Sequence, residues 1–124
     1  MRGLRILLVD DDFICSLEFA NTLRDLGCNV VEAHCASAAC ETIKRREPLG
    51  ALVTDIDLGV GKDGFAVARY ARAAYPRLPV VYISGMAAGR YAAEGVADSV
   101  FLAKPFCPQQ IVEALRGVIR LEAA

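Results

Sequence analysis

Short apolar runs alternate with amphipathic segments along the whole chain. A strand buried on both faces is a continuous run of apolar residues, whereas a surface helix repeats its apolar residues every three or four positions. On this basis we predict five strands, at residues 4–9, 29–33, 51–54, 80–83 and 99–102. The intervening segments predict helices at residues 13–26, 37–46 and 65–74, a short helix within 86–95, and a last helix that begins at Pro108.

We expect one face of the first helix to be buried, because apolar residues recur there at helical spacing. They are Phe13, Leu17, Ala20, Leu23 and Leu26. The second helix has Ser37 as its expected N-cap and cannot continue through Pro48.

Strict alternation of strands and helices predicts an α/β fold, a doubly wound parallel sheet of five strands with helices on both faces. No linker, low-complexity segment or internal repeat interrupts the alternation. We therefore expect residues 1–124 to form a single domain, with no output domain after the last helix.

Composition and charge exclude several classes of protein. The chain of 124 residues is 55% hydrophobic and 23% charged, which excludes an intrinsically disordered chain. Its net charge is −1 and it has no basic stripe, so we expect no binding to nucleic acid. No apolar run is long enough to span a bilayer and the N-terminus is unlike a secretory signal, so we expect a cytoplasmic protein.

The cysteines and the single histidine are not expected to carry chemistry. The number of cysteines is odd and their spacings match no zinc pattern. They are Cys15, Cys28, Cys35, Cys40 and Cys107. We expect His34 to be structural or exposed to solvent.

Chemically reactive side chains follow four of the predicted strands. Asp10 and Asp11 follow the first strand, Asp55 the third, Ser84 the fourth and Lys104 the fifth. Ligands of open α/β sheets bind beyond the carboxyl ends of the strands, so we expect these groups at one rim. Two carboxylates 4 Å apart repel by about 4 kcal/mol at an effective dielectric near 20. A bound Mg²⁺, which prefers oxygen ligands, would offset that repulsion.

Such a site is suited to phosphoryl transfer. The cation, Lys104 and the Ser84 hydroxyl would neutralise a phosphoryl group, and an aspartate can itself be the acceptor. Asp12, by contrast, is expected only to cap the helix that begins at Phe13.

Four segments together resemble the receiver domain of two-component response regulators. They are ILLVDDD, LVTDIDL, VVYISG and FLAKPF, in this order along the chain. The resemblance covers essentially the whole chain and implies a flavodoxin-like (βα)5 fold with strand order 2-1-3-4-5. It also implies phosphorylation by a histidine kinase or a histidine phosphotransfer protein, dependent on Mg²⁺ or Mn²⁺. The family is a signalling module and not an enzyme that turns over an external substrate.

The resemblance implies a role for each residue of the acidic rim. Asp55 is the expected phosphoacceptor. Asp10, Asp11 and Asp55 are expected to hold the metal through their carboxylates, and Asp57 through its backbone carbonyl. Lys104 is expected to pair with the phosphoryl group.

The resemblance also implies a conformational switch. Ser84 would bond the phosphoryl oxygen, and Phe101 would rotate into the space that Ser84 vacates. The peptide bond between Lys104 and Pro105 is expected to be cis.

Three features depart from the family pattern. Leu58 and Gly59 stand where many members have Met-Pro, and the loop to Gly64 is one residue longer than usual. Phe101 replaces a tyrosine and cannot donate a hydrogen bond. Asp57 and Met86 occupy positions that the family uses to tune the lifetime of the phosphoryl group.

Two other functions remain open from the sequence. One is a pseudo-receiver, a binding module that does not accept phosphate. The other is a small phosphatase of the haloacid-dehalogenase type, because Asp55-Ile56-Asp57 matches its D-x-D motif. For a receiver without an output domain we expect action by docking to a downstream protein, as a monomer or weak dimer. Residues 86–95, with Arg90 and Tyr91, are a candidate partner surface.

Overall fold

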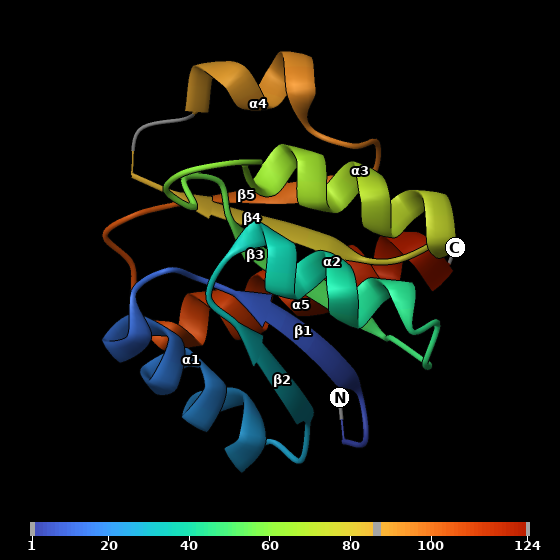
Figure 1. The fold of residues 1–124 in the computed structure, drawn as a ribbon. Helices are drawn as coiled ribbons and strands as arrows, with labels where there is room; N and C mark the ends of the chain where they lie inside the picture. Colours follow the sequence, from blue (N-terminus) through green and yellow to red (C-terminus); the bar gives the residue numbers. More distant parts are fainter. Residues whose placement is uncertain (1, 86–87, 124) are drawn as a thin grey trace.

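The computed structural model describes residues 2–85 and 88–123, and it has a five-stranded parallel sheet between two layers of helices (Figure 1). The strands are β1 (Arg5–Val9), β2 (Asn29–Ala33), β3 (Ala51–Asp55), β4 (Val80–Ser84) and β5 (Ser99–Ala103). The helices are α1 (Phe13–Asp25), α2 (Ala36–Lys44), α3 (Gly64–Ala74), α4 (Ala88–Glu94) and α5 (Pro108–Ala123). The strand order is β2-β1-β3-β4-β5, which confirms the predicted topology. Within the described ranges, no helix is both long enough and apolar enough to cross a bilayer.

The strands are continuous apolar runs because both faces of the sheet are covered. In β1, Ile6 and Leu8 pack in the core shared with α1 and α5, while Leu7 and Val9 pack in the core shared with α2 and α3. All four side chains are fully buried. Each buried aliphatic side chain contributes roughly 1.5–3 kcal/mol of transfer free energy, so β1 anchors both layers at once.

The order of the strands places the ends of β1 and β3 side by side. The chain runs from β1 outward to β2 and then returns past β1 to β3, so the connections after β1 and β3 diverge to opposite sides (Figure 1). Val9 pairs with Thr54 in register. Asp10 and Asp55, each one residue further on, therefore emerge next to each other at the switch point of the sheet.

The buried face of α1 differs from the predicted one. Ala20 and Leu23 are buried as predicted, but Phe13 and Leu17 are 66% and 53% exposed. Ser16 is buried in their place, because its hydroxyl donates a hydrogen bond of 2.7 Å to Glu32 of β2. The large apolar residues left exposed on the first turns of α1 form what we call the α1 patch: Phe13, Ile14 and Leu17.

The second helix has its N-cap two residues earlier than predicted and also ends two residues earlier. Cys35, and not Ser37, is the N-cap, because its Sγ accepts the backbone N–H of Ala38 at 3.4 Å. After the helix, Arg46 has a φ of 58°, in the left-handed region, which turns the chain out of the helical path. The short helix expected within residues 86–95 is α4, whereas Met86 lies outside the described residues.

Candidate functional site

Three carboxylates gather at the carboxyl ends of β1 and β3. The side chains of Asp10, Asp11 and Asp55 each place an oxygen within 4.8 Å of the others. Asp10 and Asp55 are buried, at 0% and 4% exposure, whereas Asp11 is exposed. Two carboxylates of the cluster are therefore buried, and Asp11 lies on its solvent-exposed side.

Asp10 has one carboxylate oxygen that the described residues leave without a partner. Its Oδ1 accepts the backbone N–H of Asp12 at 3.0 Å, but its buried Oδ2 has no hydrogen-bond donor among the residues described. Burial raises the pKa of Asp10 to about 6, against the Asp12 hydrogen bond and the Lys104 charge, which lower it. A buried oxygen without a partner costs roughly 1–3 kcal/mol. A divalent cation would satisfy this oxygen.

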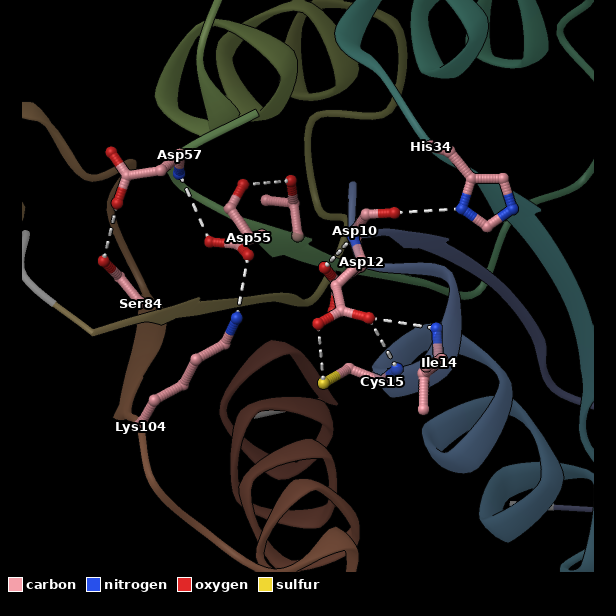
Figure 2. Close-up of polar contacts among 10 residues, drawn as sticks. Asp10, Asp12, Ile14, Cys15, His34, Asp55, Asp57, Ser84 and Lys104 are labelled. Carbon is pink, nitrogen blue, oxygen red and sulfur yellow. Dashed lines mark hydrogen bonds and ion pairs between the residues drawn. The ribbon is translucent and has the colours of Figure 1, made fainter. Parts of the chain in front are cut away.

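Asp55 is held by two donors, one on each carboxylate oxygen. Oδ1 accepts the backbone N–H of Asp57 at 3.2 Å, and Oδ2 accepts the Lys104 ammonium at 2.9 Å (Figure 2). Burial raises the pKa of Asp55, opposed by the hydrogen bond and charge of Lys104. The same pair raises the pKa of Lys104, although burial of the ammonium opposes this shift. Lys104 is therefore charged and points at the acidic cluster.

The backbone around Asp55 is fixed by a close approach of Gly64. The N–H of Gly64 donates to the Ile56 carbonyl at 2.8 Å. A Cβ at position 64 would lie 2.1 Å from the Asp55 carbonyl oxygen, closer than any side chain can come. Only glycine fits, and so the start of α3 packs directly against the residue that carries the candidate acceptor.

The loop that follows Asp57 keeps one apolar side chain in the core. Leu58 is 4% exposed and lies in the core with α2 and α3. Gly59 and Gly61 have φ values of 80° and 100°, which suit glycine, and Val60 between them is exposed. Asp63 then caps α3 by accepting the N–H of Ala66 at 3.0 Å. The loop therefore turns Val60 to solvent while Leu58 stays in the core.

Ser84 and Lys104 are brought together by strand pairing. The backbone N–H of Lys104 donates to the Ser84 carbonyl at 2.9 Å, which continues the β4–β5 ladder past its end. The Ser84 hydroxyl donates to Oδ2 of Asp57 at 3.3 Å (Figure 2). The peptide bond between Lys104 and Pro105 is cis, the isomer that the resemblance implies.

Two residues beside the cluster have supporting contacts. Asp12 is the N-cap of α1, as expected, and accepts the N–H groups of Ile14 and Cys15 at 3.0 and 3.2 Å. His34, for which the sequence predicts no part in the site, has its Nδ1 3.0 Å from the Asp10 carbonyl oxygen and its ring centroid 3.9 Å from that of Phe13. Its place in the sequence could have indicated this contact, because His34 directly follows β2 and so reaches the same rim.

Phe101 lies outside the acidic cluster, in a row of aromatic rings. Its ring is 5.4 Å from that of Tyr91, which is 5.6 Å from that of Tyr82, which in turn is 5.2 Å from Phe65. Phe101 is half-buried and Tyr82 fully buried. Movement of the Phe101 ring would therefore first change its contact with Tyr91, and through Tyr91 the packing of α4.

The candidate partner surface on α4 is tied to its neighbours. The Arg90 guanidinium pairs with Asp63 at 2.8 Å and with Glu94 at 2.7 Å. The Tyr91 hydroxyl donates to the Ser99 carbonyl at 2.7 Å. Arg90 is about half exposed, at 49%, while Tyr91 turns inward, so only part of the predicted surface faces solvent.

The donor set fits a hard divalent cation. The carboxylate oxygens suit Mg²⁺, which prefers oxygen ligands and keeps several waters. Oδ2 of Asp10, which no described residue contacts as a donor, provides a ligand, and the open side at Asp11 leaves room for water. The adjacent Lys104 leaves a positive group for an anionic ligand on the same rim.

The sequence and the fold of the chain are similar to those of known proteins. Residues 6–116 match the family model of the response regulator receiver domain. A response regulator receiver protein from Sinorhizobium medicae WSM419 is 39% identical, with a TM-score of 0.92 over 97% of each chain. The receiver domain of a sensor histidine kinase from Pseudomonas aeruginosa PAO1, solved with magnesium in its active site cleft, is 27% identical, with a TM-score of 0.81 over 95% of this chain and 98% of that one.

A curated relative is much longer than the matched region. The sensor protein TorS of Escherichia coli (strain K12) is 33% identical over 82 residues, which are 66% of this chain and 9% of TorS. The family match, by contrast, spans both the acidic cluster and Lys104. On this evidence the chain belongs to the response regulator receiver domain family of two-component signalling.

Proposed function

We propose that Asp55 accepts a phosphoryl group from a phosphohistidine and that the acidic cluster holds Mg²⁺ or Mn²⁺ for this reaction. Asp10, Asp11 and Asp55 would bind the cation through carboxylates and Asp57 through its backbone carbonyl. The observation that carries the proposal is the buried Oδ2 of Asp10, which has no donor among the residues that the structure describes, beside an aspartate already paired with a lysine. When bound, the cation neutralises charge on the phosphoryl oxygens.

The protein residues supply the nucleophile and the rest of the charge. A carboxylate oxygen of Asp55 attacks phosphorus, a P–O bond forms, and the P–N bond to histidine breaks with its electron pair left on nitrogen. The acyl phosphate adds a charge of about −1.5 to −2, by analogy with other phosphorylated residues. The Lys104 ammonium lies 2.9 Å from Oδ2 of Asp55 and is placed to pair with that charge.

We propose that the donor docks on the α1 patch. A phosphohistidine must reach Asp55, and the exposed Phe13 and Ile14 stand immediately after Asp12 at the same rim. A 240 Å³ groove adjoins this patch between α1 and the segment after β5, and its lining includes Cys15, Lys104 and Phe106. The kinship with sensor kinase receiver domains supports a histidine kinase or histidine phosphotransfer protein as the donor.

We propose that the phosphoryl group then shifts the protein toward a second conformation. Ser84 and Lys104 would bond the phosphoryl oxygens, and Phe101 would move toward the space that Ser84 leaves. Because the Phe101 ring contacts Tyr91, its movement would repack α4 against β5 and change a docking surface for a downstream protein. This is a population shift between two states, one of which binds the phosphoryl group better.

The test is intact mass after incubation with acetyl phosphate, with and without Mg²⁺, for wild type and Asp55→Asn. We expect one added phosphoryl group in wild type, dependent on Mg²⁺ and absent from the variant. A wild-type protein that binds Mg²⁺ and releases no phosphate yet gains no mass would be a binding module instead. Turnover of a generic phosphate monoester would indicate a phosphatase.

A further inference from the structure

The Ser84 hydroxyl has an acceptor in the unphosphorylated protein that lies off the acidic cluster. It donates to Oδ2 of Asp57 at 3.3 Å, and Figure 2 shows the Asp57 carboxylate turned away from Asp55 and toward Ser84. Ser84 is buried, at 1% exposure, whereas Asp57 is exposed. An ionised carboxylate only accepts hydrogen bonds, so the hydroxyl hydrogen points at Asp57.

The position of the Asp57 side chain follows from its backbone. The N–H of Asp57 donates to Oδ1 of Asp55 at 3.2 Å, which fixes the two residues relative to each other. The buried Leu58 holds the chain on the other side of Asp57. The carboxylate therefore projects from a restrained segment toward Ser84.

Two consequences oppose the phosphorylated state. A hydroxyl has one hydrogen, so Ser84 cannot donate to Asp57 and to a phosphoryl oxygen on Asp55 at the same time. The Asp57 carboxylate also repels the added negative charge. The Lys104 ammonium donates to Asp55, whereas the Ser84 hydroxyl donates to Asp57. Asp57 therefore competes with a phosphoryl group for the hydroxyl of Ser84 and not for the ammonium of Lys104.

We propose that Asp57 is a positioning residue that holds the Ser84 hydroxyl in the unphosphorylated state and thereby lowers the affinity of the site for a phosphoryl group. This inference rests on the proposed function, because it assigns Ser84 to the phosphoryl oxygens. It fixes the direction of the Asp57 effect, which the sequence leaves open. Removal of the side chain keeps the backbone carbonyl, so the proposed metal site is retained.

The experiment measures binding of beryllofluoride, a phosphoryl analogue, in the presence of Mg²⁺ by titration calorimetry. Four full-length proteins are compared: wild type, Asp57→Ala, Ser84→Ala and the double variant. We expect Asp57→Ala to bind roughly three- to tenfold more tightly than wild type, the gain of about one hydrogen bond. We expect a clearly smaller gain when Ser84 is already alanine, because the hydrogen bond to Ser84 is then absent and only the relief of charge repulsion remains.

The other outcomes overturn the inference in distinguishable ways. An equal gain in both backgrounds would assign the effect of Asp57 to charge repulsion alone. An unchanged or weaker affinity in Asp57→Ala would show that Asp57 does not lower the affinity for a phosphoryl group. The Mg²⁺ affinity of each variant, measured without beryllofluoride, shows whether the metal site has changed. If the wild-type protein neither binds beryllofluoride nor gains a phosphoryl group from acetyl phosphate, the proposed function is wrong, and this inference with it.

Discussion

The Lys104 ammonium lies 2.9 Å from Oδ2 of Asp55, so the proposed acceptor is paired with a cation before any phosphoryl group arrives. Lys104 comes from the segment after β5, and Asp55 from the end of β3. The pair therefore bridges β4 and joins the acidic cluster to the strand that carries Phe101. Loss of the ammonium should disconnect these two parts.

We expect Lys104→Ala to be phosphorylated by acetyl phosphate yet to switch poorly. The Asp55 nucleophile and the carboxylates remain, but the phosphoryl group loses the cation that draws β5 toward it. The chemical shifts of Phe101 and Tyr91, recorded with and without phosphorylation, report the switch. A phosphorylated variant with the full wild-type shift change would contradict the mechanism.

We expect Asp10 to contribute a loss of stability to the metal-free protein as pH rises from about 4 to about 6. The pKa of Asp10 is raised from 3.8 to about 6 by burial, so in this range the native state binds more protons than the unfolded state. Over the whole range, the pKa shift of Asp10 corresponds to a change of about 3 kcal/mol in the free energy of unfolding. Other groups titrate too, so the informative quantity is the difference between wild type and Asp10→Asn.

Urea unfolding in EDTA, at about pH 5 and about pH 7.5, measures that difference. Asp10→Asn should be more stable than wild type, and more so at the higher pH, because the amide removes a buried charge and can donate to neighbouring carboxylates. If Asp10→Asn were no more stable than wild type at the higher pH, burial of the charged Asp10 carboxylate would not destabilise the fold.

Affinity for Mg²⁺ should weaken below about pH 6, where Asp10 must lose a proton before its oxygen can bind the cation. The loss should approach tenfold per pH unit, the value for release of one proton. Calorimetric titrations in two buffers of different ionisation enthalpy detect that proton directly. Affinity that is flat across this range would exclude Asp10 as a ligand that titrates there.

Gly64→Ala should destabilise the fold and disturb phosphorylation together. The added Cβ would lie 2.1 Å from the Asp55 carbonyl oxygen, so the backbone must move, at a cost of roughly 2 kcal/mol or more. The matched control is Gly117→Ala in α5, where nothing lies within 4 Å of the new Cβ. The control should be more stable by about 0.5–1 kcal/mol, as expected for alanine in a helix. Equal effects of the two changes in thermal unfolding would argue against the close approach.

Ile14→Gln should weaken transfer from a phosphohistidine donor without affecting labelling by acetyl phosphate. Ile14 is 81% exposed on the α1 patch, so its removal leaves the core intact but takes apolar area from the proposed contact. Central interface residues commonly account for a tenfold or larger change, and we expect roughly that loss in transfer rate. Val60→Gln, at another fully exposed apolar position, is the control and should transfer normally.

The rim of the sheet was predictable because parallel strands share a direction. Once the apolar runs are assigned as strands, whatever follows them must meet at one end, and Asp10, Asp55, Ser84 and Lys104 do so. The sequence could not predict the face of α1, because burial of Ser16 depends on Glu32 of β2 as a hydrogen-bond partner. Nor could it predict the direction of the Asp57 side chain, which is decided by a contact across 27 residues.

The order in which the site is assembled limits when it can work. Its groups come from β1, β3 and β4 and from the residue after β5, and β5 is both the last strand in the chain and an edge of the sheet. An emerging or partly folded chain has the acidic residues but no ammonium beside them until that edge has docked. Competence to switch should therefore arise in one step with completion of the sheet, so that an incomplete molecule that gained a phosphoryl group would not change its docking surface.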